Sequence, residues 1–224
     1  MAEMSSASTA GLSREQEEAA FYHEAALNTT WTGTRLMIGV VASGLGAFVF
    51  AFFYLRSLNS HGLWYPGGAH ATKPSLGVGT AIMVLIVLSA LLATAGLQQI
   101  KSGKRSTWLT AAIVALVLGV AAGAVQIWQL TSLSFQPGGS GFASVFVAAS
   151  AVFAALVLST MIWLEILVTR ARQLPEISFV EQPPTFVEAA AVQRFQASLS
   201  GFTLFWNFIA VAAFVLWVLF YLVH

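Results

Sequence analysis

The chain alternates between long stretches without a charged side chain and short polar segments. The uncharged stretches are residues 36–55, 74–100, 106–164 and 195–224. A helix needs about 20 mainly apolar residues to cross the hydrocarbon core of a bilayer, so each stretch is long enough for a span. The third stretch is long enough for two spans, and the serines, proline and glycines at 132–141 favour a turn between them.

Composition leads to the same conclusion. Hydrophobic residues make up 58% of the chain and charged residues 8%, against about 25% charged in soluble domains, so lipid is expected to surround most of it. The apolar stretches lack the strict alternation of a strand, and a helix satisfies its own backbone in lipid. We predict an all-α integral membrane protein, a bundle of five transmembrane helices at about 35–56, 75–100, 107–130, 142–168 and 196–223.

A polar segment, residues 1–30, precedes the predicted membrane domain of residues 31–224. It is rich in glutamate and lacks the apolar core of a cleavable signal peptide, so the first span is expected to act as the insertion signal. Ser13 and Gln16 fit a capping box, which predicts a short helix over about residues 13–27. The plain interpretation is a solvated lead-in helix, and the alternative is a helix that docks onto another subunit.

Basic residues are distributed unevenly over such a bundle. With five spans, the N-terminus shares one side with the loops at 101–106 and 169–195. Lysine and arginine concentrate in cytoplasmic segments, which predicts a cytoplasmic N-terminus and a C-terminus outside. Of the 10 basic residues, Arg56 and Lys73 fall on the outer side, and the other eight are Arg14, Arg35, Lys101, Lys104, Arg105, Arg170, Arg172 and Arg194.

Histidine and cysteine, the commonest ligands of redox centres, are missing from the predicted spans, and the five methionines of the chain show no paired spacing. Haem, copper and di-iron centres need inward-facing His, Met, Cys or carboxylate ligands. The chain has no cysteine, and its histidines, His23, His61, His70 and His224, fall outside the spans. We expect no catalytic residue, metal or cofactor in this chain, although His61 and His70 leave open a surface metal site. No long basic run indicates nucleic-acid binding.

Glu165 is the one ionisable residue within a predicted span, close to its cytoplasmic end. Buried ionisable residues usually mark proton or ion pathways. The preferred interpretation is a carboxylate that reaches the interface or pairs with Arg170 or Arg172, and a functional proton site is the alternative.

Small residues at helical spacing predict close packing, because they let two helix backbones approach. The sequence leaves open whether they pack within the bundle or against a neighbouring protein. Gln126 and Gln129 are polar residues near the outer end of the third span, where we expect hydrogen bonds between helices, with headgroup or water contact as the alternative. The predicted packing positions are Gly39, Ser43, Gly46, Ala115, Gly119 and Gly123.

Several short segments occur in a characteristic order along residues 31–224. The first span ends in AFFYLR at 51–56, and an outer loop with Trp64 follows. The third span closes with GAVQIWQ at 123–129, and the last span holds WNF at 206–208. In this order the segments resemble subunit III of the haem-copper oxidases, in its five-helix form, where the third span closes with GxxQxxE and the last span holds WHF.

Departures from the family pattern remove ionisable groups from the bilayer interior. The family's buried glutamate falls on Val41, and its histidines fall on Phe153 and Leu156. Asn207 replaces the histidine of WHF, and Gln129 stands where a glutamate is usual. The aspartate that follows WHF falls on Ala210. A role in proton uptake through these positions therefore does not carry over, whereas a stabilising and lipid-holding role does.

The resemblance implies a non-catalytic component of a terminal respiratory oxidase of the cytochrome c oxidase type, in the cell membrane of a prokaryote. It would pack against the catalytic subunit I, next to subunit II and other subunits of the respiratory complex or supercomplex, and bind phospholipid. Haem and copper are expected in the partner subunits. Residues implied in lipid or subunit contact are Arg56, Trp64, Gln126, Gln129, Trp206, Asn207 and Phe208.

Two alternatives remain open at the level of sequence. One is an accessory subunit of a quinol oxidase or nitric oxide reductase, because the electron-donor site lies on other subunits. The other is a stand-alone small membrane transporter, which inverted repeats or Gly/Pro-broken spans would favour. No proline lies inside a predicted span.

Overall fold

The computed structural model describes residues 14–58, 64, 73–174 and 186–223, and this part of the chain is helical with no strand. A π-helical turn extends the last helix. The elements are α1 (Arg14–Ser57), α2 (Leu76–Lys101), α3 (Arg105–Thr131), α4 (Gly141–Gln173), α6 (Phe186–Trp217) and η2 (Val218–Leu222).

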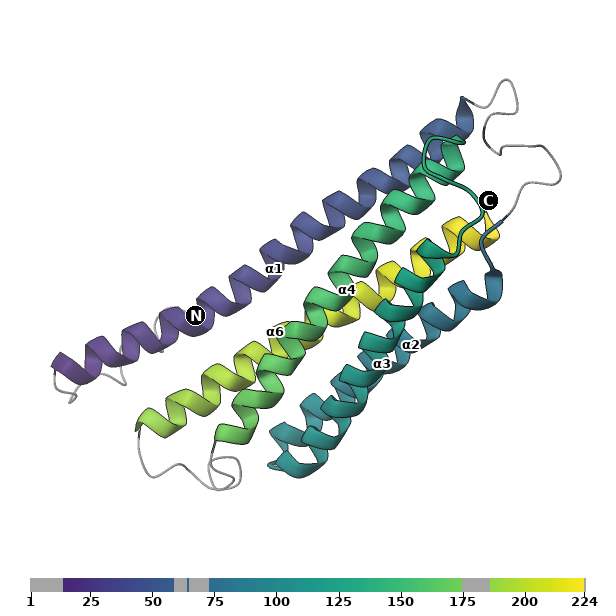
Figure 1. Cartoon of the computed structure of the whole chain (residues 1–224). Helices are drawn as coiled ribbons and strands as arrows, with labels where there is room; N and C mark the ends of the chain where they lie inside the picture. The colour runs from purple at the N-terminus through teal and green to yellow at the C-terminus, as the bar shows by residue number, and fades with distance from the viewer. Residues whose placement is uncertain (1–13, 59–63, 65–72, 175–185, 224) are drawn as a thin grey trace.

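Five of these helices are long and apolar enough to cross a membrane, which confirms the predicted number of spans. They run along a common direction, and the start of α1 and the end of η2 lie at opposite ends of the bundle (Figure 1). A multi-pass membrane protein follows from this arrangement. Which end faces the cytoplasm stays a prediction.

α1 is a single helix in which the predicted short helix and the predicted first span are continuous. Its 44 residues extend over about 66 Å, roughly twice the thickness of the hydrocarbon core. Ser13 of the predicted capping box lies outside the described residues. The N-terminal half of α1 follows α6, where His23 Nε2 lies 2.6 Å from Gln193 Oε1. This contact and the absence of proline from α1 explain why the helix does not end where the sequence becomes polar.

The bundle has three layers. α2 and α3 form a tightly packed antiparallel hairpin on one side, α4 and α6 lie in the middle, and α1 covers the opposite side through contacts with α6 and α4 (Figure 1). Gly103, with φ of 77°, allows the short turn between α2 and α3.

The predicted turn between the third and fourth spans is confirmed. Gly138 has φ of 88°, a conformation that glycine adopts without strain. Ser140 then caps α4, because its Oγ accepts a hydrogen bond from the backbone N–H of Ala143 at 3.0 Å. The serine and glycines of this segment thus end one transmembrane helix and start the next.

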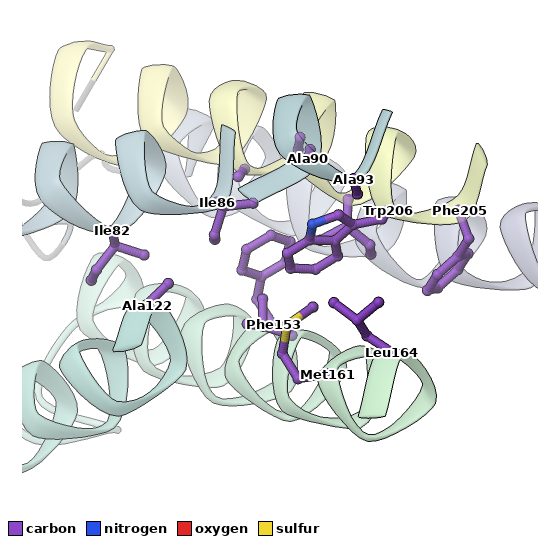
Figure 2. Packing of buried hydrophobic residues seen from close by; sticks show 14 of the residues in the cluster. Ile82, Ile86, Ala90, Ala93, Ala122, Phe153, Met161, Leu164, Phe205 and Trp206 are labelled. Carbon is purple, nitrogen blue, oxygen red and sulfur yellow. The ribbon is translucent and has the colours of Figure 1, made fainter. Parts of the chain in front are cut away.

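Trp206 of α6 lies at the centre of the core. Its side chain is fully buried, between Ile86 of α2 and Phe153 and Met161 of α4 (Figure 2). Lipid is as apolar as these side chains, so the core is held by close packing and by hydrogen bonds between helices rather than by exclusion of water.

Candidate functional site

A hydrogen-bond relay joins three helices in the middle of the bundle. Trp206 Nε1–H donates to Ser89 Oγ at 3.1 Å, and the Ser89 hydroxyl donates to the carbonyl oxygen of Ala115 at 2.7 Å. All three residues are buried. Every polar group must find a partner in a dry interior, so this relay fixes the relative positions of α6, α2 and α3.

Asn207, the next residue on α6, points to α2. Its Nδ2 donates to Thr94 Oγ1 at 3.0 Å. Phe208 is partly buried and packs against the core. Trp206 and Asn207, which the resemblance implied in lipid or subunit contact, therefore contact other helices of the same chain. The sequence drew attention to these two residues but not to Ser89 or Thr94, because single hydroxyl residues in an apolar helix carry no distinctive pattern.

Gln126 and Gln129 both make the predicted hydrogen bonds between helices. Gln126 Nε2 donates to the carbonyl oxygen of Ser150 on α4 at 3.1 Å. Gln129 Nε2 donates to the hydroxyl of Tyr221 in η2 at 2.9 Å. Both glutamines are buried. They tie α3 to α4 and to the end of the last helix.

An aromatic cluster closes the end of the bundle at which α1 ends. Trp64 is buried and packs edge-to-face on Phe52 of α1 and on Phe142 of α4, with ring centroids 5.0 and 5.8 Å apart. Arg56 Nη1 donates to the carbonyl oxygen of Val223 at 2.5 Å, so the end of α1 is fastened to the end of the chain. Trp64 is thus an internal packing residue, whereas the exposed Arg56 is free to meet a headgroup as well.

The small residues of α3 pack within the bundle. A Cβ added to Gly119 would lie 2.1 Å from Met161 Sδ, and one added to Gly123 would lie 2.6 Å from Leu158 Cδ2. Ala115 is fully buried one turn earlier. The alternative that the sequence left open is therefore settled for α3, whose small-residue face contacts α4 and α2.

The small residues of α1 face outward instead. An added Cβ would meet no atom within 4 Å at Gly39 or Gly46, and Ser43 is exposed, with its hydroxyl bonded to the carbonyl of Gly39 on the same helix. They lie on one exposed helix face between the bulky Leu36 and Phe50. We call this surface the α1 outer face, formed by Leu36, Gly39, Val40, Ser43, Gly46, Ala47 and Phe50.

α1 is the least covered span of the bundle. Only 11% of its most apolar window is buried, against 33% to 56% in the other four spans. A helix so little covered by its own chain contacts lipid or another protein. The recessed small residues between bulky ones have the shape that accepts a second helix at close range.

The charged side chains of the described bundle are exposed, or half-buried in the case of Arg105. Glu165 is exposed on α4, about 36 Å along the helix from its first residue, which places it beyond one hydrocarbon thickness. Within the described residues it forms no ion pair with Arg170 or Arg172. Its exposure agrees with the interpretation that it reaches the interface, whereas the predicted pairing is not observed.

Among the histidines, His23 is buried against α6, which the sequence did not predict. His61, His70 and His224 lie outside the described residues. Within those residues, no group of three or more His, Cys, Asp or Glu side chains is placed to hold a metal ion.

Comparison with known proteins adds no family assignment: no protein-family model matches the chain, and no curated protein matches it. The resemblance to oxidase subunit III therefore stays a prediction. What the structure defines is a class, a five-helix membrane bundle with an internally paired polar core and one uncovered helix.

Proposed function

We propose that this protein is a non-catalytic subunit of a terminal respiratory oxidase, one that packs against the catalytic subunit through the α1 outer face and stabilises the complex. The observation that carries the proposal is the combination of small recessed residues and low burial on α1. A transmembrane helix of the partner, with haem and copper bound in that partner, would cover Gly39, Ser43 and Gly46.

The paired polar core supports a structural role. The buried side chains of Trp206 and Gln129 and the half-buried side chain of Asn207 form hydrogen bonds to other helices of the chain. Such pairing holds the bundle in one arrangement, and a rigid bundle presents a fixed surface to a partner. Phospholipid is expected to fill the remainder of the α1 surface, with Arg56 available to a headgroup.

Gentle purification of the tagged chain from its own membrane tests the proposal. We expect a larger polytopic protein to co-purify, together with haem absorption bands from that partner. Haem-free material without such a partner contradicts the proposal. Flux of solutes into liposomes that hold this chain alone would favour a transporter instead.

A variant set tests the docking surface. Replacing Gly39, Ser43 and Gly46 together with leucine is expected to reduce co-purification of the partner at least tenfold, because leucine side chains hold the second helix away. The matched control is Ala124→Leu, a small and exposed residue on α3, which is expected to leave co-purification unchanged. Equal loss in both variants would show that the α1 outer face is not the docking surface.

Turnover by the purified complex distinguishes the electron donors. Oxidation of cytochrome c supports a cytochrome c oxidase, whereas oxidation of quinol, or reduction of nitric oxide, assigns the subunit to one of the alternative enzymes.

A further inference from the structure

A small, partly open cavity lies between α2, α3, α4 and the end of the last helix. Its volume is about 40 Å³. Most of its wall is apolar, but the polar side chains of Gln126, Gln129, Ser150 and Tyr221 take part in it. The lining includes Gly79, Gln126, Gln129, Ser150, Phe153 and Tyr221.

Among the residues that line the cavity, Gln126 is the one with a fully buried side-chain atom that lacks a hydrogen-bond partner. Its side chain is 6% exposed, and its Nε2 is bonded to the Ser150 carbonyl, but its Oε1 has no hydrogen-bond partner within the described residues. An unpaired buried carbonyl destabilises the folded state, because it has lost its hydrogen bonds to water without gaining a replacement. Because an amide oxygen only accepts hydrogen bonds, the missing partner has to be a donor.

The size of the cavity decides which donor fits. One water molecule needs about 10 to 15 Å³ of cavity volume, so this cavity has room for about three water molecules. A phospholipid headgroup is far larger than this space. A hydrogen-bond donor of the size of water is therefore the ligand that the cavity accepts.

Gly79 and Tyr221 shape the outer wall of the cavity. A Cβ added to Gly79 would lie 2.2 Å from Tyr221 Cζ, so only glycine admits the tyrosine ring at this place. The ring is carried by the π-helical turn η2, and such turns are frequent at functional sites. Tyr221 and Phe220 also line a separate hollow of about 200 Å³ next to Lys73 and Pro74, so these two rings separate the cavity from the outer end of the bundle.

We propose that the cavity is a buried hydration site, in which water enters past Tyr221 and Phe220 and donates a hydrogen bond to Gln126 Oε1. This inference does not depend on the proposed function, because every residue involved belongs to this chain. In addition to its hydrogen bond to α4, Gln126 then binds water within an otherwise apolar bundle.

Magnetisation transfer from water, measured by solid-state NMR on the full chain in lipid bilayers, tests the proposal. The side-chain amide of Gln126, assigned through its loss in Gln126→Met, is expected to receive water magnetisation several-fold faster than the amide of Asn207. Asn207 is the matched control, since its amide is paired with Thr94 and does not line the cavity. Equal transfer to the two amides would overturn the proposal.

A cavity-filling variant gives an independent readout. Ala213 is buried and lines the cavity, so Ala213→Val is expected to displace the water while leaving the bond between Gln126 and Ser150 in place. Transfer to Gln126 should then fall to the level of Asn207. Unchanged fast transfer in a variant with an unaltered Asn207 resonance would contradict the proposed location of the water. If the Ala213→Val variant does not fold, the comparison of the Gln126 and Asn207 amides in the unmodified chain still tests whether water binds at Gln126.

Discussion

At the scale of single residues, identical residue types have opposite environments. A Cβ added to Gly119 on α3 would overlap Met161, whereas a Cβ added to Gly39 on α1 would meet no atom within 4 Å. Both belong to small-residue patterns of the same spacing. The pattern alone therefore indicates that a helix is able to pack closely, and the position of the helix in the bundle decides what it packs against.

Replacing Gly119 tests this difference. Gly119→Val is expected to destabilise the bundle by about 1 to 3 kcal/mol, because the new side chain overlaps Met161 and forces α3 and α4 apart. Thermal unfolding in detergent measures the change. Gly39→Val, on the uncovered face, is the control and should leave unfolding of the isolated chain nearly unchanged. A similar loss in both variants would contradict the assignment.

Ser89 is the residue that the relay depends on. Ser89→Ala is expected to lower the unfolding free energy by about 1 kcal/mol, because the Trp206 N–H loses its acceptor and the Ala115 carbonyl loses its interhelical donor. Ser43→Ala, which removes only a bond within α1, should have little effect. Equal stability of the two variants would show that the relay does not hold the helices together.

At the scale of elements, the length of α1 separates it from the other helices. Its 44 residues exceed what a bilayer requires, and its N-terminal half lies along α6 through His23 and Gln193. The sequence predicts the apolar half of this helix from its lack of charge. It does not predict that the polar and apolar halves form one continuous helix. The apolar residues end at Arg35 because contact with lipid ends there, whereas the helix itself continues.

Cysteine labelling tests how α1 meets the membrane. The natural chain has no cysteine, so a single introduced thiol reports without background. Phe21 and Val40 are similarly exposed on α1, at 68% and 73%. A membrane-impermeant maleimide is expected to label Phe21→Cys in open membranes but not Val40→Cys, because a thiolate forms only where water reaches it. Fast labelling at Val40→Cys would contradict the position of Val40 within the membrane.

At the scale of the whole molecule, the five spans put the two ends of the described bundle on opposite sides of the membrane. The distribution of basic residues predicts that the α2–α3 turn is cytoplasmic and the α3–α4 turn is outside. Both turns are short and are ordered by the glycines Gly103 and Gly138. The assignment of sides remains a prediction.

The same labelling approach decides the orientation. In intact cells, an impermeant maleimide is expected to react with Gln136→Cys in the outer turn and to reach Ser102→Cys only after the cells are permeabilised. Both positions are exposed in the structure, so access to the reagent rather than burial determines the result. The reverse pattern would place the N-terminus outside.

The sequence alone determined that this protein is a five-helix membrane bundle. Long stretches without charge transfer into lipid, and this can be predicted without knowing which helices are neighbours. The sequence also located the turn at 137–141 and the polar positions Gln126 and Gln129. Only the tertiary structure decided which helix faces are covered, which partners the polar groups find and where a cavity remains. Those properties depend on how side chains distant in the sequence meet across helices, and small residues and single hydroxyl groups look alike until that packing is known.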